Sequence, residues 1–220
     1  MSDTKTNHKP SQRVVTASGA SVYLDALDEA EIRMYDIAYG LNHVVRWAGQ
    51  LGKRTVAAHS AMVTYMAQQV APSDRKLHRH ALLHDATEAY LGELPGVVKS
   101  YLPKYVELEE TLHARILATW GIPALGKQGE EILKKLDTIA SAADMIIAGA
   151  VKPPKAGLFS VPAKSGGNVM AKRVHKNDVL YLELNHEGVA CNVPIGRTWA
   201  ARIPTFEYYA TELLGEYDYA

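Results

Sequence analysis

The chain has 220 residues, and its 24 Lys and Arg balance its 24 Asp and Glu, so the formal net charge is zero. This length allows one domain with a full core, and the neutral balance lacks the global positive field that holds a long polyanion such as DNA. The single cysteine, Cys191, excludes an intramolecular disulfide framework and a cysteine-based zinc site, so histidines are the better metal candidates.

The N-terminal region is polar and then β-prone. Residues 1–12 lack the apolar stretch of a signal peptide, and no segment of the chain approaches about 18 uninterrupted apolar residues. We therefore expect a disordered tail at 1–12 and no membrane partner. In residues 13–24, Ser18 and Gly19 separate two β-prone runs, which predicts a short extended pair.

Helical periodicity governs most of the next 120 or so residues. Apolar residues recur every three to four positions and predict five helices: from Asp28 until Gly49, from the cap Thr55 to Pro72, from Ser73 or Asp74 to Leu91, over 105–120, and over 129–149. The stretch that contains Lys99 is interpreted as a short loop.

The C-terminal third reads differently. Residues 151–173 are rich in Pro, Gly, Lys and Ser, which predicts a loop or insertion. Apolar runs at 179–184 and 189–193 flank a turn-like stretch that ends in Gly188, which predicts a β-hairpin, and a last helix follows at about 204–214.

These elements predict an all-α fold. We expect a bundle of about six helices, with a short N-terminal extended segment and a C-terminal β-hairpin as embellishments. The domain boundaries follow the same division: a core at 13–150, a loop and hairpin insertion at 151–198, and a C-terminal helix within 199–220 that packs on the core.

Two histidines and two aspartates on three predicted helices are candidate metal ligands. His59 and Asp137 lie among apolar residues at helical spacing, so both should face the core. His84 and Asp85 are about 100° apart on a helix, so both reach one ion only if that helix edge faces it. Such a set suits Mn, Co, Zn, Fe or Mg, and Glu88, one turn after His84, could orient or deprotonate an attacking water.

Each candidate also has a structural interpretation. His59 alone could be a buried core residue, and Asp137 could be paired with Lys134, Lys135 or a helix N-terminus instead of a metal. Only the whole set favours an ion.

A second site is conceivable on the third helix. His80 and His84 are four residues apart and could form a different site with Glu88. We rank it below the first set, because His78 and His80 lie beside Arg79 in a stretch that looks solvated.

Basic and aromatic residues lie near the candidate ligands in the sequence. Arg46, Lys99 and Lys134 could hold phosphate oxygens, and Trp47 could stack on a sugar or base. Singly, each would be a solvated charge or a packing aromatic.

In their order and spacing, these residues resemble the HD-domain superfamily of metal-dependent phosphohydrolases, in the branch of bacterial 5′-deoxynucleotidases and phage deoxynucleoside triphosphate hydrolases. The resemblance covers about residues 13–147 and rests on five segments: TASGASVYLDAL, YDIAYGLNHVVRWAG, TVAAHSAMV, HALLHDATEAYLGELPGVVK and KKLDTIASAAD. It implies these roles: His59, His84, Asp85 and Asp137 bind the metal, Glu88 is the catalytic carboxylate, Arg46, Lys99 and Lys134 contact phosphates, and Trp47 packs on the deoxyribose or base and helps to exclude a 2′-hydroxyl.

The sequence departs from this family in three places. Ala58 stands where Glu or Gln is common, and Glu93 stands where the bacterial nucleotidases have Asp in a Gly-Asp-Leu-Pro loop. We expect Glu93 to line the substrate site and to alter how deeply the phosphate sits. The region from residue 151 is longer than in that branch, so its hairpin could serve oligomerisation or shield the pocket.

The resemblance implies metal-dependent hydrolysis of a deoxynucleotide at the 5′ phosphoester. We favour a dATP-type triphosphohydrolase that releases deoxynucleoside and triphosphate; the alternatives are a 5′-deoxynucleotidase, an enzyme that cleaves an alarmone or cyclic nucleotide, and a non-catalytic nucleotide sensor. The expected cofactor is one divalent ion (Co, Zn, Mn or Mg), with room for a second Mg at the phosphates. We also expect a homo-oligomer, a dimer or hexamer, in the cytoplasm of a bacterium or a phage-infected host.

Overall fold

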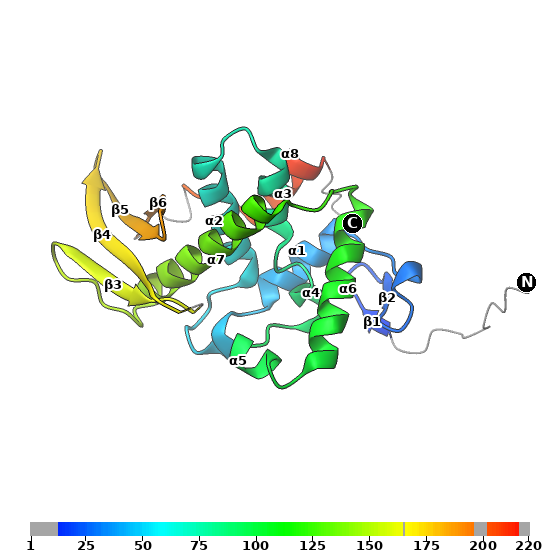
Figure 1. Cartoon of the computed structure of the whole chain (residues 1–220). Coiled ribbons are helices and arrows are strands. Elements are labelled where there is room, and N and C mark those ends of the chain that lie inside the picture. The colour runs from blue at the N-terminus through cyan, green and yellow to red at the C-terminus, as the bar shows by residue number, and fades with distance from the viewer. Residues whose placement is uncertain (1–12, 165, 196–201, 216–220) are drawn as a thin grey trace, which may run out of the picture.

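The fold combines helices with two antiparallel sheets, so the all-α expectation is wrong (Figure 1). The computed structural model describes residues 13–164, 166–195 and 202–215. The tail expected at 1–12 lies outside the described residues, as do the ends of the expected C-terminal segments at 196–201 and 216–220.

The elements follow one another along the chain as two strands, a helical region, four strands and a last helix. Their bounds are β1 Arg13–Val15, β2 Ser21–Tyr23, η1 Leu27–Glu29, α1 Met34–His43, η2 Trp47–Gly49, α2 Val56–Val70, α3 Arg75–Leu83, α4 Glu88–Leu91, α5 Gly96–Lys99, α6 Pro103–Thr119, α7 Lys127–Ile147, β3 Leu158–Pro162, β4 Asn168–Lys176, β5 Val179–His186, β6 Val189–Pro194 and α8 Phe206–Leu214. No helix among the described residues is both long enough and apolar enough to cross a membrane.

The N-terminal strand pair is anchored to the first helix. β1 and β2 are antiparallel around the Ser18–Gly19 turn, which confirms the expected extended pair. The buried carboxylate of Asp36 on α1 accepts hydrogen bonds from the amide and the hydroxyl of Ser18, both at 2.7 Å. Because both oxygens of this buried group are hydrogen-bonded, its burial is compensated and the turn is held on the core.

The first predicted helix is shorter than expected. α1 ends at His43, because Val44 turns extended and its carbonyl accepts the amide of Val56 at 3.0 Å, while the amide of Arg46 donates to Arg54 at 2.8 Å. The β-branched pair Val44 and Val45 favours such extended pairing. Trp47 therefore lies in a loop and does not belong to the end of α1.

The third predicted helix is interrupted where the candidate ligands begin. α3 ends at Leu83, and the amides of Ala86 and Glu88 donate to carbonyls three residues earlier, on Leu83 and Asp85, both at 3.0 Å. Side chains three residues apart eclipse in such tight winding. The expectation that His84 and Glu88 lie on one continuous α-helix is therefore wrong.

One glycine sets the distance between α1 and α4. A Cβ added at Gly40 would lie 2.8 Å from the carbonyl oxygen of Ala89 and 2.9 Å from its Cα. Glycine is required for so close an approach of two backbones. It brings the segment that carries Glu88 against α1.

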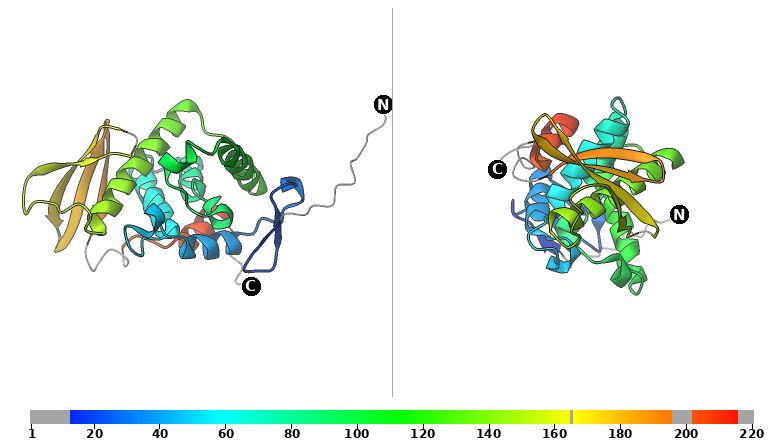
Figure 2. Two further views of the ribbon diagram at one scale, coloured as in Figure 1. Left: turned by 90° about the horizontal axis from the view of Figure 1, so that it is seen from below. Right: turned by 90° about the vertical axis from the view of Figure 1, so that its left-hand side faces the viewer.

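The sheet β3-β4-β5-β6 stands at one end of the molecule, opposite the β1–β2 pair (Figure 2). The hairpin expected between β5 and β6 is confirmed, and its turn has positive φ at Glu187 and Gly188. The loop expected at 151–173 is wrong in part, because β3 and the first residues of β4 form about half of that stretch. Val161 and Val169 are paired across these strands and fully buried, but the surrounding Pro, Gly and Lys obscure the period of two.

The last helix covers one side of the helical region. Its predicted position at about 204–214 agrees with α8, which Thr205 caps through its hydroxyl. Arg79 on α3 donates to the carbonyl of Leu213 at 2.8 Å, and Arg75 donates to that of Glu212 at 3.0 Å. These two arginine side chains of α3 thus hold the end of α8 against the helical region.

Candidate metal centre

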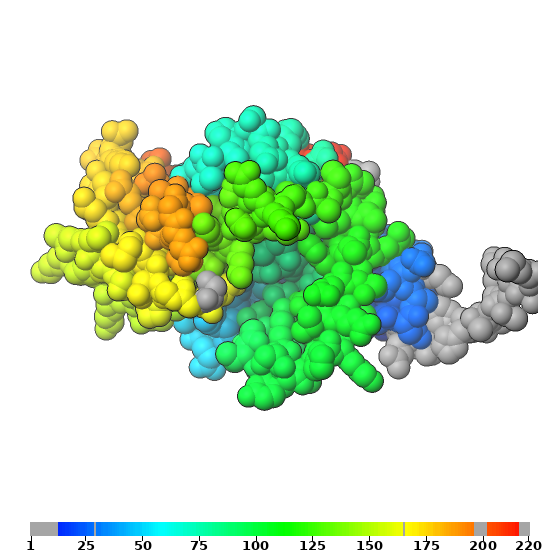
Figure 3. All heavy atoms as spheres, viewed as in Figure 1, coloured from blue at the N-terminus to red at the C-terminus, as the bar shows by residue number. Residues whose placement is uncertain are grey.

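Four side chains from three helical segments meet at one point. His59 Nε2 lies 3.0 Å from Asp137 Oδ1, and His84 Nε2 lies 3.1 Å from Asp85 Oδ2. The cross distances are 4.0 Å from His59 Nε2 to Asp85 Oδ2 and 3.9 Å from His84 Nε2 to Asp137 Oδ1. On this face a hollow lies between the yellow region of β3 and β4 and the green region of α5 and α6, with blue-green chain at its bottom (Figure 3).

The donor atoms have the spacing that one divalent ion requires. Ligand atoms that share an ion at about 2.0–2.2 Å lie about 3 to 4 Å from one another. One ligand atom each from His59, His84 and Asp137 falls within 4.8 Å of the other two, which makes these three a metal-binding candidate. The carboxylate of Asp85 lies beside the same imidazoles.

Both imidazoles are oriented by their far nitrogen. His59 Nδ1 donates to Asp144 Oδ2 at 2.9 Å, and His84 Nδ1 donates to the carbonyl of Ala81 at 2.8 Å. Acceptors of this kind fix Nδ1 as the protonated nitrogen and direct the lone pair of Nε2 toward the site, as in known metal centres. Nε2 of His84 is buried and has no hydrogen-bond partner, which is what an absent ligand would leave.

Asp144 is the main group that the sequence analysis missed. Its fully buried carboxylate accepts from His59, forms an ion pair with Arg46 at 3.3 Å, and accepts from the Nε of Arg54 at 2.9 Å. Burial alone would raise its pKa, but the hydrogen bond from His59 and the two guanidinium groups hold that pKa below its usual value. The available signal was its place seven residues after Asp137, on the same helix face.

Arg46 binds to protein groups in this structure. Its guanidinium donates to Asp85 Oδ2 and to Ser141 Oγ, both at 3.1 Å, and only 5% of the residue is exposed. Burial would raise the pKa of Asp85, but His84, Arg46 and His59 hold that pKa well below its usual value. Arg46 thus keeps Asp85 ionised.

Asp137 has a cationic partner that was not foreseen. Lys164, in the turn between β3 and β4, lies 2.7 Å from Asp137 Oδ2 and 2.9 Å from Oδ1. Burial would raise the pKa of Asp137, but the adjacent His59 and the charge of Lys164 hold that pKa far below its usual value. The neighbours that the sequence suggested, Lys134 and Lys135, do not form this pair.

Glu88 is a buried carboxyl beside the candidate ligands. Only 5% of it is exposed, and its Oε2 has no hydrogen-bond partner. Burial and the charge of Asp85 raise its pKa to about 9, although Arg46 and Lys99 oppose this shift. At neutral pH Glu88 therefore carries a proton, the state that a general acid needs.

Lys99 contacts side chains of α6. Its ammonium donates to Glu109 Oε1 at 2.6 Å and lies 5.8 Å from the ring centre of Tyr105. These contacts engage Lys99 with α6, although it still lowers the pKa of Glu88.

Glu93 supports a strained loop. Its two oxygens accept the amides of Trp47, at 3.1 Å, and of Ala48, at 3.0 Å. Both residues have positive φ, 60° and 47°, which is costly for side chains other than glycine. Glu93 thus binds the loop that positions Trp47, and the described contacts assign it no direct role toward a substrate.

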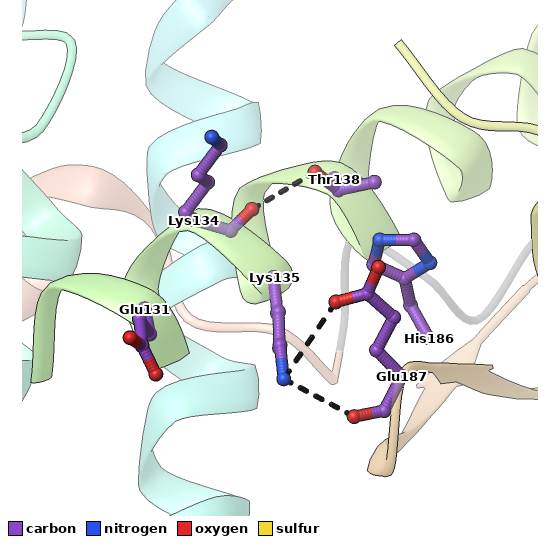
Figure 4. Close-up of a pocket in the computed structure, with 6 residues that line it drawn as sticks. All are labelled: Glu131, Lys134, Lys135, Thr138, His186 and Glu187. Carbon is purple, nitrogen blue, oxygen red and sulfur yellow. Dashed lines mark hydrogen bonds and ion pairs between the residues drawn. The ribbon is translucent and has the colours of Figure 1, made fainter. Parts of the chain in front are cut away.

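Lys134 lines a different hollow. Lys134, Thr138 and His186 belong to a cavity of about 310 Å³ between α7 and the β5–β6 turn (Figure 4). None of the four candidate ligands lines it. Lys135 lies 3.7 Å from the carboxylate of Glu187 in the same hollow, whereas Lys134 extends away from that pair (Figure 4).

The competing histidine pair does not form a site. His80 Nε2 bonds to the carbonyl of Pro123 at 3.0 Å, and His78 Nε2 bonds to that of Ala71 at 2.8 Å. They are 5% and 3% exposed, so the expectation of a solvated stretch is wrong. Both fasten α3 to neighbouring loops.

The comparisons with known proteins place this chain beside two relatives. It is 34% identical over 111 residues to the uncharacterized protein YfdR of Escherichia coli. The aligned region makes up 50% of this chain and 59% of that relative. It is 37% identical over 126 residues to an uncharacterized protein of Rhodobacter capsulatus, and this aligned region makes up 54% of this chain and 64% of that relative. The chain thus spans less than two thirds of the length of either protein. No protein-family model matches it.

Proposed function

We propose that this protein is an HD-type, metal-dependent phosphohydrolase that cleaves deoxynucleotides at the 5′ phosphoester. The observation that carries the proposal is the convergence of His59, His84, Asp85 and Asp137, in which Nδ1 orients both imidazoles and Nε2 of His84 is buried without a hydrogen-bond partner. Imidazole and carboxylate donors together suit Zn, Mn, Co or Mg.

Each residue of the site has a distinct role in the proposed hydrolysis. His59, His84, Asp85 and Asp137 would hold the divalent ion, which would supply a nucleophile at neutral pH and polarise the phosphoryl group. Asp144 keeps the His59 imidazole oriented, and Arg46 keeps Asp85 ionised. Glu88, whose pKa is raised in the metal-free protein, is the group to which we assign the general acid: it would donate a proton to the 5′ oxygen as the bond from phosphorus to that oxygen breaks.

The substrate class rests on the family resemblance. Trp47, held in its loop by Glu93, is the group that we assign to the deoxyribose or base. We retain the triphosphate as the leading substrate, with deoxynucleoside and tripolyphosphate as products, and a second Mg²⁺ would then accompany the phosphates.

A deoxynucleoside monophosphate is the second candidate, and a specific observation favours it. Of the three cations expected to hold phosphates, Arg46 is bound to Asp85, Lys99 is bound to Glu109, and Lys134 lines another hollow. Fewer available cations suit a smaller anion.

The experiment that tests the function is a substrate panel. Purified protein is incubated with each dNTP and dNMP and with the matching ribonucleotides, in the presence of Co, Mn, Zn or Mg, and the products are resolved by ion-exchange chromatography. Tripolyphosphate from a dNTP supports the leading candidate, and orthophosphate from dNMPs alone supports the second. Glu88→Gln serves as the inactive control that keeps its metal. Absence of any metal-dependent cleavage, with the metal bound, refutes the proposal and favours a nucleotide sensor.

A further inference from the structure

The sheet insertion brings a lysine into the metal centre from outside the helical core. Lys164 lies between β3 and β4, and its ammonium contacts both carboxylate oxygens of Asp137, at 2.9 and 2.7 Å. The same Asp137 is 3.0 Å from Nε2 of His59, a candidate ligand. Lys164 and His59 thus share Oδ1 of Asp137 in this structure.

Backbone hydrogen bonds link the described residues of the turn that carries Lys164. The amide of Ala163 donates to the carbonyl of Gly167, and the amide of Gly166 donates to that of Ala163, both at 3.1 Å. Gly166 and Gly167 have φ of 93° and 74°, which glycine adopts without strain. Pro162 pairs with Asn168 at the base of the turn, so the sheet fixes where the lysine side chain starts.

Lys164 differs from the arginines of the centre in its freedom to move. The side chains of Arg46 and Arg54 are 7% and 14% exposed, whereas that of Lys164 is 38% exposed. A lysine ammonium on a flexible stem can change partner, while a buried guanidinium with fixed bonds cannot do so cheaply. The rim of the hollow in Figure 3 includes the yellow region to which Lys164 belongs.

The charge around Lys164 favours an anion. Between Asp144 and Asp178 the chain has no Asp or Glu and has six cations: Lys152, Lys155, Lys164, Lys172, Arg173 and Lys176. The protein as a whole is neutral, so this segment is locally positive beside an acidic ligand set. Such a local field concentrates small anions near the site.

We propose that Lys164 is a phosphate-binding residue that also neutralises Asp137 when no ion is bound. A divalent ion on Asp137 repels the ammonium, which then moves to the nearest negative group, a phosphoryl oxygen of the substrate. This role rests on the proposed function for its substrate class. It makes the sheet insertion a part of the binding site rather than only an embellishment.

The test compares Lys164→Gln with Lys172→Gln, a change of an exposed lysine on the same sheet. Titration calorimetry first measures Mn²⁺ binding to each protein, and then binding of inorganic phosphate after the Mn²⁺-loaded protein is freed of excess ion. Lys164→Gln should bind Mn²⁺ as well as the wild type or more tightly, because a competing cation is gone, and should bind phosphate about tenfold more weakly. Lys172→Gln should match the wild type in both, and Lys164→Arg should restore part of the phosphate affinity.

The outcomes separate this inference from the proposed function. Equal phosphate affinity in the wild type and Lys164→Gln overturns it, as does loss of Mn²⁺ binding in Lys164→Gln, which would make the lysine a support for the ligands. If the substrate panel detects no hydrolysis but phosphate binding still depends on Lys164, the inference stands while the phosphohydrolase proposal falls. With an active enzyme, Lys164→Gln should raise KM by about tenfold and leave kcat within about threefold.

Discussion

Asp144→Asn tests whether the buried carboxylate behind His59 orients the metal centre. The side chain of Asp144 is 0% exposed, and those of its partners Arg46 and Arg54 are 7% and 14% exposed, so removal of its charge breaks a buried ionic network. Such a loss costs about 3 to 5 kcal/mol, a large part of the stability of a typical domain, and lowers the Tm by about 6 to 20 °C at this chain length.

The same substitution should weaken metal binding. An asparagine can still accept from Nδ1 of His59, but without a negative charge it makes that imidazole a poorer ligand, and such outer groups typically change metal affinity 10- to 100-fold. Calorimetric titration with Mn²⁺ at a temperature where circular dichroism shows the variant folded gives the affinity, and urea unfolding gives the stability. Because the pKa of Asp144 is lowered, its stabilising effect is present at neutral pH and fades as the pH falls below about 3.9, so the two proteins should converge in acid.

The control for this experiment is Glu183→Gln. Glu183 pairs with Lys176 at 2.9 Å on the sheet surface, with side chains 42% and 50% exposed, so its loss should change stability by less than about 1 kcal/mol and leave Mn²⁺ affinity unchanged. If folded Asp144→Asn binds Mn²⁺ within twofold of the wild type, Asp144 does not support the ligand set.

Three further predictions address the surroundings of the site. The pKa of Glu88 is raised to about 9, above its value of about 4.3 in the unfolded chain. The metal-free protein should therefore lose up to about 1.4 kcal/mol of stability per pH unit as the pH rises between these values. Glu88→Gln should flatten this slope in urea unfolding with EDTA, and an unchanged slope would contradict the raised pKa. Gly40→Ala should destabilise the fold by about 1 to 3 kcal/mol despite the better helix propensity of alanine, because its Cβ would lie 2.8 Å from the carbonyl oxygen of Ala89. A variant that thermal unfolding shows to be stabilised would mean that α1 and α4 are not in close contact. Glu93→Asp should withdraw the carboxylate from the amides of Trp47 and Ala48 and raise KM with Mn²⁺ affinity unchanged, whereas unaltered kinetics would disconnect this loop from the substrate.

The candidate ligands could be found from the sequence because each lies in a helical region with a clear period. His59 is fully buried on α2, as its apolar neighbours predict, half-buried Asp137 lies 3.0 Å from it, and Thr55 and Asp74 cap the helices as expected. Periodicity failed after Leu83, where α3 ends and hydrogen bonds to carbonyls three residues earlier replace those of an α-helix. Local sequence does not reveal this change, because most residues tolerate both types of winding.

The partners of the site could not be predicted, because they come from distant segments. Lys164 reaches Asp137 from a sheet whose first two strands the sequence analysis had interpreted as a loop. Arg46 was expected to face a phosphate, yet it is bound to Asp85 and Asp144, and only the three-dimensional arrangement decides between these partners. Because those strands were interpreted as a loop, the predicted fold class was all-α, whereas the fold is mixed.

The most direct test of the central claim is an anomalous-difference map from a crystal of this protein grown with Co²⁺. The account predicts one strong peak at about 2.0 to 2.3 Å from Nε2 of His59, Nε2 of His84 and carboxylate oxygens of Asp85 and Asp137. A map with no peak among these four side chains, or with its only peak elsewhere, would contradict it.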